Sequence, residues 1–271
     1  MSVNLNVEKI GASLKTSIAV IPGWFPGLSH VEIVQQIAAY GFDAFESLGA
    51  RDWEDRAEVG ACCRDLGVRV GAVSGSGSIN DDGPVNPQFH ATFEKEIRET
   101  IPKARDLGST AICGTVGADR EDMSREQQMD NIAAAGKRVA PMLEDAGMTL
   151  VWEPLNIKVN HAGYFLVYSK DAAEIVRRTG SVAVKILFDV YHQQISEGDV
   201  IRNIQEYAAE IGHYHFADNP GRHEPSTGEL NYKSIFKAIH ETGYRGVVSA
   251  ELGKTMETEQ ILRVLAECGN W

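Results

Sequence analysis

The chain has 271 residues, of which 43% are hydrophobic and 24% are charged, a balance typical of a globular protein with a large core. The formal net charge of −12 disfavours nucleic acid and anionic membranes as partners, because an acidic surface repels phosphate groups. No run approaches the roughly 20 apolar residues that span a bilayer, the N-terminal residues lack a signal-peptide pattern, and the four cysteines form no C-x-x-C pair, so we expect a cytoplasmic protein.

Short apolar runs alternate with longer amphipathic runs along the whole chain. The short runs are apolar or β-branched on both faces, which is typical of parallel strands buried on both sides. The predicted strands are 14–21, 42–46, 68–74, 110–114, 149–153, 184–189, 212–217 and 246–251.

The amphipathic runs between these strands are predicted to be helices. Ser29 is expected to cap a helix over 30–40, and Ser124, with Gln127 three residues on, has the capping-box pattern for a long helix that ends at 146. Further helices are predicted at 170–178, 200–210, 232–242 and 255–268.

The repeat of strand and helix predicts the architecture. Successive strands begin roughly 26 to 42 residues apart, as βα units require. Eight such units favour a single α/β domain over residues 1–271, a parallel (β/α)₈ TIM barrel, over an open doubly wound sheet. No G-x-G-x-x-G motif follows the first strand, which also disfavours a dinucleotide-binding fold.

Polar residues end four consecutive predicted strands, where a barrel of this kind builds its active site. They are Glu153, Asp189, His215 and Glu251. Neighbouring strands lie about 4.8 Å apart, so these side chains can converge, and three converging carboxylates repel one another unless a cation lies between them. An oxygen-rich set with one imidazole and no thiolate predicts Mn²⁺ or Mg²⁺, with Co²⁺ or Zn²⁺ as alternatives.

Each of these residues also has a purely structural interpretation. Asp189 alone could be a helix cap, His215 alone a hydrogen-bonded core residue, and each glutamate the partner of a nearby lysine. Four such residues on four successive strands favour the metal site.

Two long segments of the second half resemble the hydroxypyruvate isomerase family, which belongs to the xylose-isomerase-like barrels. They are ILFDVYHQQISEGD, which begins at Ile186, and ADNPGRHEPSTGELNY, which begins at Ala217; the shorter motifs EPLN, at Glu153, and GYFL, at Gly163, resemble the family too.

The resemblance implies roles for individual residues. Glu153 and Glu251 would be proton-transfer residues as well as metal ligands, and Asp189 a metal ligand. His192 and Arg222 would hold substrate oxygens. Glu46 would lie near the substrate, although a surface or capping role is an equal alternative for this residue.

His215 marks a departure, because hydroxypyruvate isomerases often carry glutamine there, whereas the keto-sugar 3-epimerases carry histidine. The resemblance therefore implies a metal-dependent isomerase that interconverts a small hydroxy-aldehyde and hydroxy-ketone, a hydroxypyruvate-type acid or a keto sugar, through a cis-enediolate. A 3-epimerase, a 3-keto-sugar lyase and a non-catalytic sugar-binding barrel stay open as alternatives. A DNA-hydrolysing barrel is disfavoured by the acidic charge. We also expect a homo-oligomer, a dimer or a tetramer.

Overall fold

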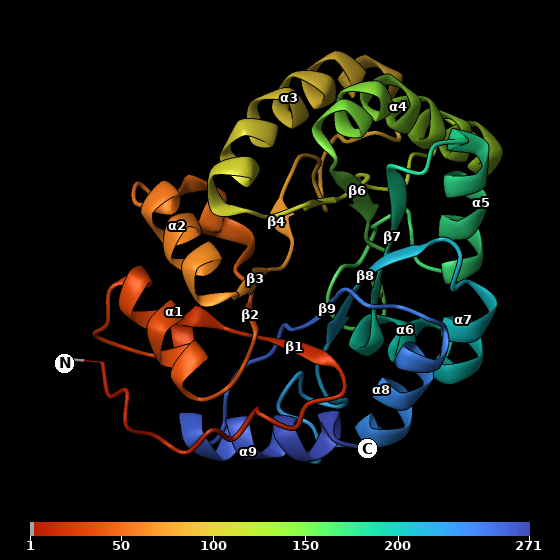
Figure 1. Cartoon of the computed structure of the whole chain (residues 1–271). Helices are drawn as coiled ribbons and strands as arrows, with labels where there is room; N and C mark the ends of the chain where they lie inside the picture. The colour runs from red at the N-terminus through yellow and green to blue at the C-terminus, as the bar shows by residue number, and fades with distance from the viewer. Residues whose placement is uncertain (1–2) are drawn as a thin grey trace.

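The computed structural model describes residues 3–271, and it is a ring of helices around a central sheet (Figure 1). The strands of the sheet are β1 (Ser17–Val20), β2 (Ala44–Phe45), β3 (Arg69–Val70), β4 (Val73–Ser74), β5 (Ala111–Gly114), β6 (Thr149–Trp152), β7 (Val184–Asp189), β8 (Ile211–Phe216) and β9 (Val247–Ala250). Neighbours pair in parallel in the order β3-β2-β1-β9-β8-β7-β6-β5-β4.

The two ends of this order are halves of one predicted strand. Both β3 and β4 fall within 68–74, separated by Gly71 and Ala72; β3 pairs with β2 and β4 pairs with β5. The described residues therefore supply eight strand positions in a closed circle, and the predicted (β/α)₈ barrel is confirmed.

The helices lie on the outside of the sheet. They are α1 (His30–Ala39), α2 (Arg56–Leu66), α3 (His90–Leu107), α4 (Arg125–Ala146), α5 (Ser169–Thr179), α6 (Val190–Ser196), α7 (Val200–Glu206), α8 (Tyr232–Glu241) and α9 (Thr258–Gly269), with short 3₁₀ turns at Pro22–Trp24, Leu48–Asp52 and Pro87–Phe89. Both predicted caps are present as capping boxes, in which Ser29 pairs with Glu32 and Ser124 pairs with Gln127.

Three of these helices, α2, α3 and α6, are not among the predicted ones. Asp55, with Glu58 three residues on, has the sequence pattern of a cap for α2, although its side chain makes no cap hydrogen bond. Helix α3 continues the 3₁₀ turn Pro87–Phe89, which Asn86 caps. Helix α6 follows β7 without a loop, because Asp189 both ends the strand and caps the helix.

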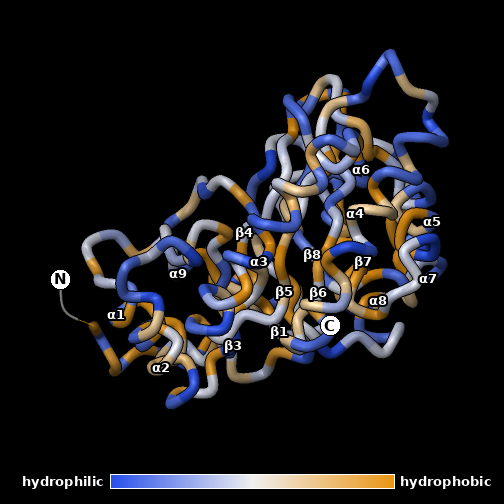
Figure 2. The backbone as a smooth tube through the Cα atoms, turned by 90° about the horizontal axis from the view of Figure 1, so that it is seen from above, coloured by the Kyte–Doolittle hydropathy of each residue, from blue (hydrophilic) through white to orange (hydrophobic). Residues whose placement is uncertain are grey.

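The core lies between the sheet and the helices, and hydrophobic residues recur along the central strands (Figure 2). In β7, Ile186, Leu187 and Phe188 are fully buried, as expected for a strand covered on both faces. Trp152 of β6 packs outward on Phe93 of α3, with ring centroids 5.3 Å apart. Across residues 3–271, no helix is both long enough and apolar enough for a membrane crossing.

Candidate active site

The four residues predicted to bind a cation come together at one end of the barrel. Glu153 follows β6, Asp189 ends β7, His215 lies in β8 and Glu251 follows β9. In the sheet register Asp189 lies directly opposite His215. Each of the four residues offers a ligand atom, and these atoms all lie within 4.8 Å of one another. The convergence expected from strand ends is therefore present.

Asp189 combines the two roles that the sequence left open. Its Oδ1 accepts hydrogen bonds from the backbone N–H of Tyr191 (2.8 Å) and His192 (3.4 Å), which caps α6. Its Oδ2 is fully buried and has no hydrogen-bond partner. A buried carboxylate oxygen without a partner is costly, so this atom indicates a place for a cation.

His215 lies between carboxylates on both sides of its ring. Its Nδ1 is 2.8 Å from Glu251 Oε2 and 3.8 Å from Glu153 Oε1, whereas its Nε2 is 2.6 Å from Glu46 Oε1. Burial favours the neutral imidazole, but the charge of Glu46 and the hydrogen bond with Glu251 outweigh it and raise the pKa of His215.

The two glutamates have opposite electrostatic environments. Burial, followed by the charge of Glu251, raises the pKa of Glu153 to about 8. Burial acts on Glu251 in the same direction, but the hydrogen bond and charge of His215, together with Arg222, lower the pKa of that carboxyl group. Such a pair can hold one proton between two carboxylates, which suits acid–base work.

This set of ligand atoms fits a hard divalent cation. It offers carboxylate oxygens from Glu153, Asp189 and Glu251 and one imidazole nitrogen from His215, with no thiolate among them. Oxygen ligands with one imidazole are the preference of Mn²⁺ and Mg²⁺, and a cation would relieve the repulsion among the three acids.

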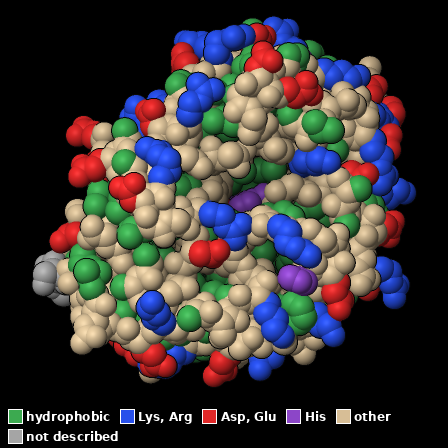
Figure 3. All heavy atoms as spheres, in the orientation of Figure 1, with side chains coloured by type: hydrophobic (Ala, Val, Ile, Leu, Met, Phe, Trp, Pro, Cys, Tyr) green, Lys and Arg blue, Asp and Glu red, His purple; other side chains and the backbone are tan. Residues whose placement is uncertain are grey.

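A cavity of about 650 Å³ opens over this cluster. Figure 3 shows a hollow at the centre of the molecule with a histidine inside it and charged side chains at its rim. Four predicted site residues line the cavity: Glu153, His192, Arg222 and Glu251. Its volume is in the range of small-molecule sites.

His192 presents one ring nitrogen as a donor to the site. Its Nδ1 faces donors of Asn156, the backbone N–H at 3.3 Å and the side-chain amide at 2.6 Å, so the ring proton lies on Nε2. That Nε2 is buried, has no hydrogen-bond partner and lies 3.7 Å from Asp189 Oδ2. Burial lowers the pKa of His192 to about 4, so the ring is a neutral donor at pH 7.

Arg222 reaches the same point from the loop after β8. Its Nη2 lies 2.9 Å from Glu251 Oε2 and 3.6 Å from Asp189 Oδ2. The buried Asp218 shapes this loop, because its carboxylate accepts the backbone N–H groups of Asn219, Gly228 and Leu230. The loop thus holds a positive charge over the carboxylates.

Comparison with known protein families agrees with the barrel fold of the chain. The model of the xylose isomerase-like TIM barrel family matches residues 34–268. The chain belongs to this family.

Curated relatives within the family carry isomerase names. The hydroxypyruvate isomerase of Escherichia coli K12 is 34% identical over 177 residues, 65% of this chain and 68% of that protein. A putative hydroxypyruvate isomerase of Homo sapiens is 29% identical over 257 residues, 88% of this chain and 91% of that protein. The resemblance to hydroxypyruvate isomerases is confirmed.

Solved structures of the same fold have more varied names. A structure described as an AP endonuclease of family 2 from Brucella melitensis has a TM-score of 0.79 and 26% identity, and covers 93% of this chain and 98% of its own. An L-ribulose 3-epimerase has a TM-score of 0.70 and 26% identity, over 93% of this chain and 86% of its own.

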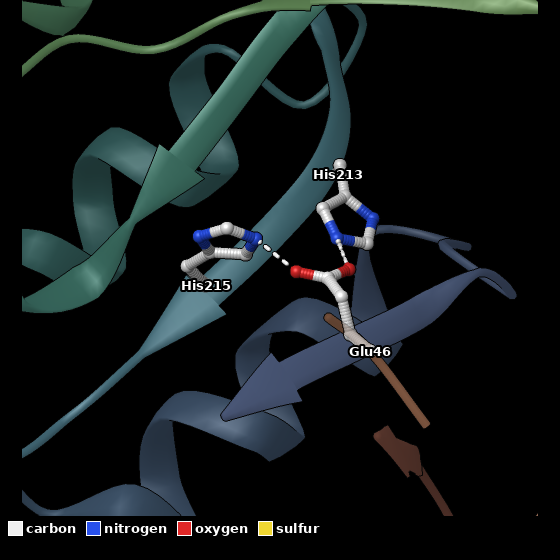
Figure 4. Close-up of side chains that lie close together, drawn as sticks. All are labelled: Glu46, His213 and His215. Carbon is white, nitrogen blue, oxygen red and sulfur yellow. Dashed lines mark hydrogen bonds and ion pairs between the residues drawn. The ribbon is translucent and has the colours of Figure 1, made fainter. Parts of the chain in front are cut away.

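Glu46 does not line the cavity, and unlike Asp189 and His215 it is not part of the four-residue cluster beneath it. It was expected near the substrate, but its carboxylate lies below His215, between the rings of His213 and His215 (Figure 4). Only 5% of Glu46 is exposed, and the imidazole of His215 separates it from Glu153 and Glu251. Direct substrate contact is therefore not supported for Glu46.

Three further polar residues contact the predicted site residues, and the sequence analysis assigned no role to them. His213 and Ser249 both contact Glu46, and Asn156 holds His192. The alternation His-Tyr-His in β8 was a usable signal for His213, because residues two apart in a strand point to the same face.

Proposed function

We propose that this protein is a metal-dependent isomerase that moves a proton between neighbouring carbons of a small hydroxy-carbonyl compound through a cis-enediolate. The observation that carries the proposal is that Glu153 and Glu251 belong to a cluster of side chains able to bind a cation, and that this cluster faces a cavity of small-molecule size. The curated relatives named isomerases support the same class of reaction.

The chain supplies two proton-transfer groups. We assign Glu153 and Glu251 to this work, because both carboxylates line the cavity and both lie beside His215 Nδ1. One accepts the proton of the substrate C–H bond and a proton is then returned to the adjacent carbon, while the hydroxyl proton passes to the former carbonyl oxygen. Together these transfers convert a hydroxy-aldehyde into a hydroxy-ketone or the reverse.

The remaining groups stabilise negative charge on the substrate oxygens. A divalent cation held by Glu153, Asp189, His215 and Glu251 would polarise the hydroxyl and carbonyl oxygens and make the intervening C–H bond more acidic. His192 offers the Nε2–H donor, and Arg222 offers a guanidinium charge at the rim. Fixed donors of this kind favour an enediolate over its neutral precursor.

A hydroxypyruvate-type acid is the substrate class that we favour. Its carboxylate suits a site rimmed by Arg222, and the two relatives described above are named for hydroxypyruvate. The cytoplasmic location and the homo-oligomeric state expected from the sequence stay predictions.

A keto-sugar 3-epimerase is the second candidate. His215 is the residue that the resemblance associates with that group, and the L-ribulose 3-epimerase supports it as a neighbour in fold. In an epimerase, the two glutamates would act on opposite faces of one carbon instead of on two carbons.

The test is an exchange experiment in D₂O with Mn²⁺. Hydroxypyruvate, tartronate semialdehyde, tetruloses, psicose and fructose are incubated with the protein, and deuterium incorporation and products are followed by NMR. Product from hydroxypyruvate or tartronate semialdehyde supports the isomerase, and inversion of psicose or fructose at C3 supports the epimerase. Protein that loads Mn²⁺ but incorporates no deuterium from any of them contradicts both candidates.

A further inference from the structure

We infer that Glu46 is a positioning residue: it fixes the ring of His215 with its proton on Nε2, so that Nδ1 faces the cation site. The inference rests on the cation site proposed above and adds a residue that does not touch the cavity. Its basis is the arrangement of partners around the two carboxylate oxygens of Glu46.

The two oxygens of Glu46 have different partners. Oε2 accepts three donors: the backbone N–H of Ala72, the hydroxyl of Ser249 at 2.8 Å and Nε2 of His213 at 2.7 Å. Oε1 lies 2.6 Å from Nε2 of His215. Three donors on one oxygen hold the carboxylate in a single orientation, and the other oxygen is directed at His215 (Figure 4).

This arrangement decides which nitrogen of His215 is free for a cation. A carboxylate oxygen only accepts hydrogen bonds, so Nε2 must carry a proton where it meets Glu46. Without a cation, Nδ1 also faces carboxylate oxygens, 2.8 Å from Glu251 Oε2 and 3.8 Å from Glu153 Oε1, and donates to Glu251. A cation in the cluster would take the place of the Nδ1 proton, and the proton on Nε2 would stay with Glu46. A carboxylate behind a ligating histidine fixes the tautomer and makes the ring a stronger ligand.

The third predicted strand is interrupted beside this carboxylate. A Cβ atom at position 71 would lie 2.1 Å from Glu46 Oε2, so only glycine leaves room there. Gly71 and Ala72 are the residues at which the third strand is interrupted between β3 and β4, and the Ala72 N–H thereby turns to Glu46. A buried carboxylate is no gain for stability compared with a packed apolar side chain, which favours a role in the site.

The decisive variant is Glu46→Gln. Because three donors converge on the Oε2 position, the amide oxygen takes that position and the amide NH₂ faces His215. Nε2 must then accept a hydrogen bond, and the ring proton moves to Nδ1, which can no longer bind a cation. Ser249→Ala is the matched control, because it removes one donor from Oε2 and leaves the oxygen that faces His215 unchanged.

The measurements are Mn²⁺ affinity by calorimetry and the tautomer of His215 by ¹⁵N NMR of histidine-labelled full-length protein loaded with Zn²⁺. Wild-type protein should show Nδ1 bound to the metal and a proton on Nε2. Glu46→Gln should weaken Mn²⁺ binding by about 10- to 100-fold, while Ser249→Ala binds like wild type. Thermal melting of both metal-free variants checks that folding is intact.

The possible outcomes distinguish the positioning role of Glu46 from the proposed cation site. Wild-type affinity in Glu46→Gln, equal losses in Glu46→Gln and Ser249→Ala, or coordination of wild-type His215 through Nε2 overturns the positioning role alone. Failure of wild-type protein to bind any of Mn²⁺, Mg²⁺, Co²⁺ and Zn²⁺ overturns the proposed cation site, and this role with it. If Glu46→Gln does not fold, the wild-type tautomer decides the question by itself.

Discussion

The guanidinium of Arg222 lies 2.9 Å from the carboxylate of Glu251, so a positive side chain closes over one of the two proposed proton-transfer groups. Arg222 is also 3.6 Å from Asp189 and stacks over the ring of Tyr191, with its central carbon 5.3 Å from the centroid. These contacts place the guanidinium at the cavity, where it can exchange a protein carboxylate for a substrate oxygen.

Arg222→Ala should lower kcat/KM and spare cation binding. A hydrogen bond to a charged group contributes about 1.5–3 kcal/mol, which corresponds to roughly a 10- to 100-fold loss. Mn²⁺ affinity should be unchanged or higher, because a competing positive charge has been removed. Steady-state kinetics and calorimetry measure the two effects. Arg177→Ala, at the surface contact with Glu210, is the control, and an equal loss of Mn²⁺ affinity in Arg222→Ala would contradict a substrate role.

Removal of divalent ions should abolish activity, and Mn²⁺, Mg²⁺ or Co²⁺ should restore it. The cation would also stabilise the fold, because it neutralises the three clustered carboxylates. At 100 times the dissociation constant the gain is about 2.7 kcal/mol, which raises Tm by roughly 5–11 °C for a chain of this size. Melting curves with and without chelator measure this change in Tm. Full turnover in chelated protein would exclude a catalytic cation.

Glu153→Gln and Glu251→Gln should each reduce turnover by roughly 10² to 10⁴, because an amide keeps the shape of the carboxyl group but cannot accept the proton. The variant without the initiating base should no longer exchange substrate hydrogen in D₂O, whereas the other can exchange hydrogen and still fail to form product.

Asp189→Asn is the comparison for these two variants, since Asp189 is proposed to bind the cation alone. Its main defect should be weaker Mn²⁺ binding, and excess Mn²⁺ should restore part of its turnover. Wild-type turnover of either glutamine variant with Mn²⁺ bound would remove that glutamate from the chemistry.

The free energy of unfolding should fall as the pH is lowered from about 7.5 to 5.5, in part through His90. This residue is buried at the start of α3, with Nε2 3.0 Å from the carbonyl oxygen of Pro84, and burial lowers its pKa. Below the ordinary value near 6.5 the unfolded chain therefore binds the proton before the folded chain does, so protonation favours unfolding.

His90→Gln removes this titratable group, so the free energy of unfolding of the variant should depend less on pH than that of wild type. The variant should lose less stability than wild type between pH 7.5 and 5.5 in urea titrations. Parallel pH dependences of the two proteins would show that His90 contributes nothing.

Strand ends were enough to predict that the carboxylates and His215 lie together, because parallel strands bring their carboxyl ends to one edge of the sheet whatever the helices do. Asp189 and His215 illustrate this: both were identified from position alone, and the register sets them side by side.

The setting of Glu46 could not be predicted in the same way. Its partner His213 is 167 residues away in the chain, and the space for its carboxylate depends on a glycine at position 71. Nothing near position 46 signals such a long-range arrangement. Helix α3 was missed for a different reason: the 3₁₀ turn Pro87–Phe89 leads directly into it, and the cap of that turn, Asn86 followed by Pro87, is a start signal that the sequence analysis did not use.

The double role of Asp189 has a consequence for motion. One carboxylate oxygen holds the first amides of α6, while the other points into the carboxylate–histidine cluster. A cation bound to that cluster and the capped end of α6 would therefore share a single side chain. Ion binding should therefore slow hydrogen exchange most strongly at the amides of Tyr191 and His192, by raising the free energy of local opening there. The turn that carries His192 would then become more rigid as the site fills, and its donor would be aligned before a substrate arrives.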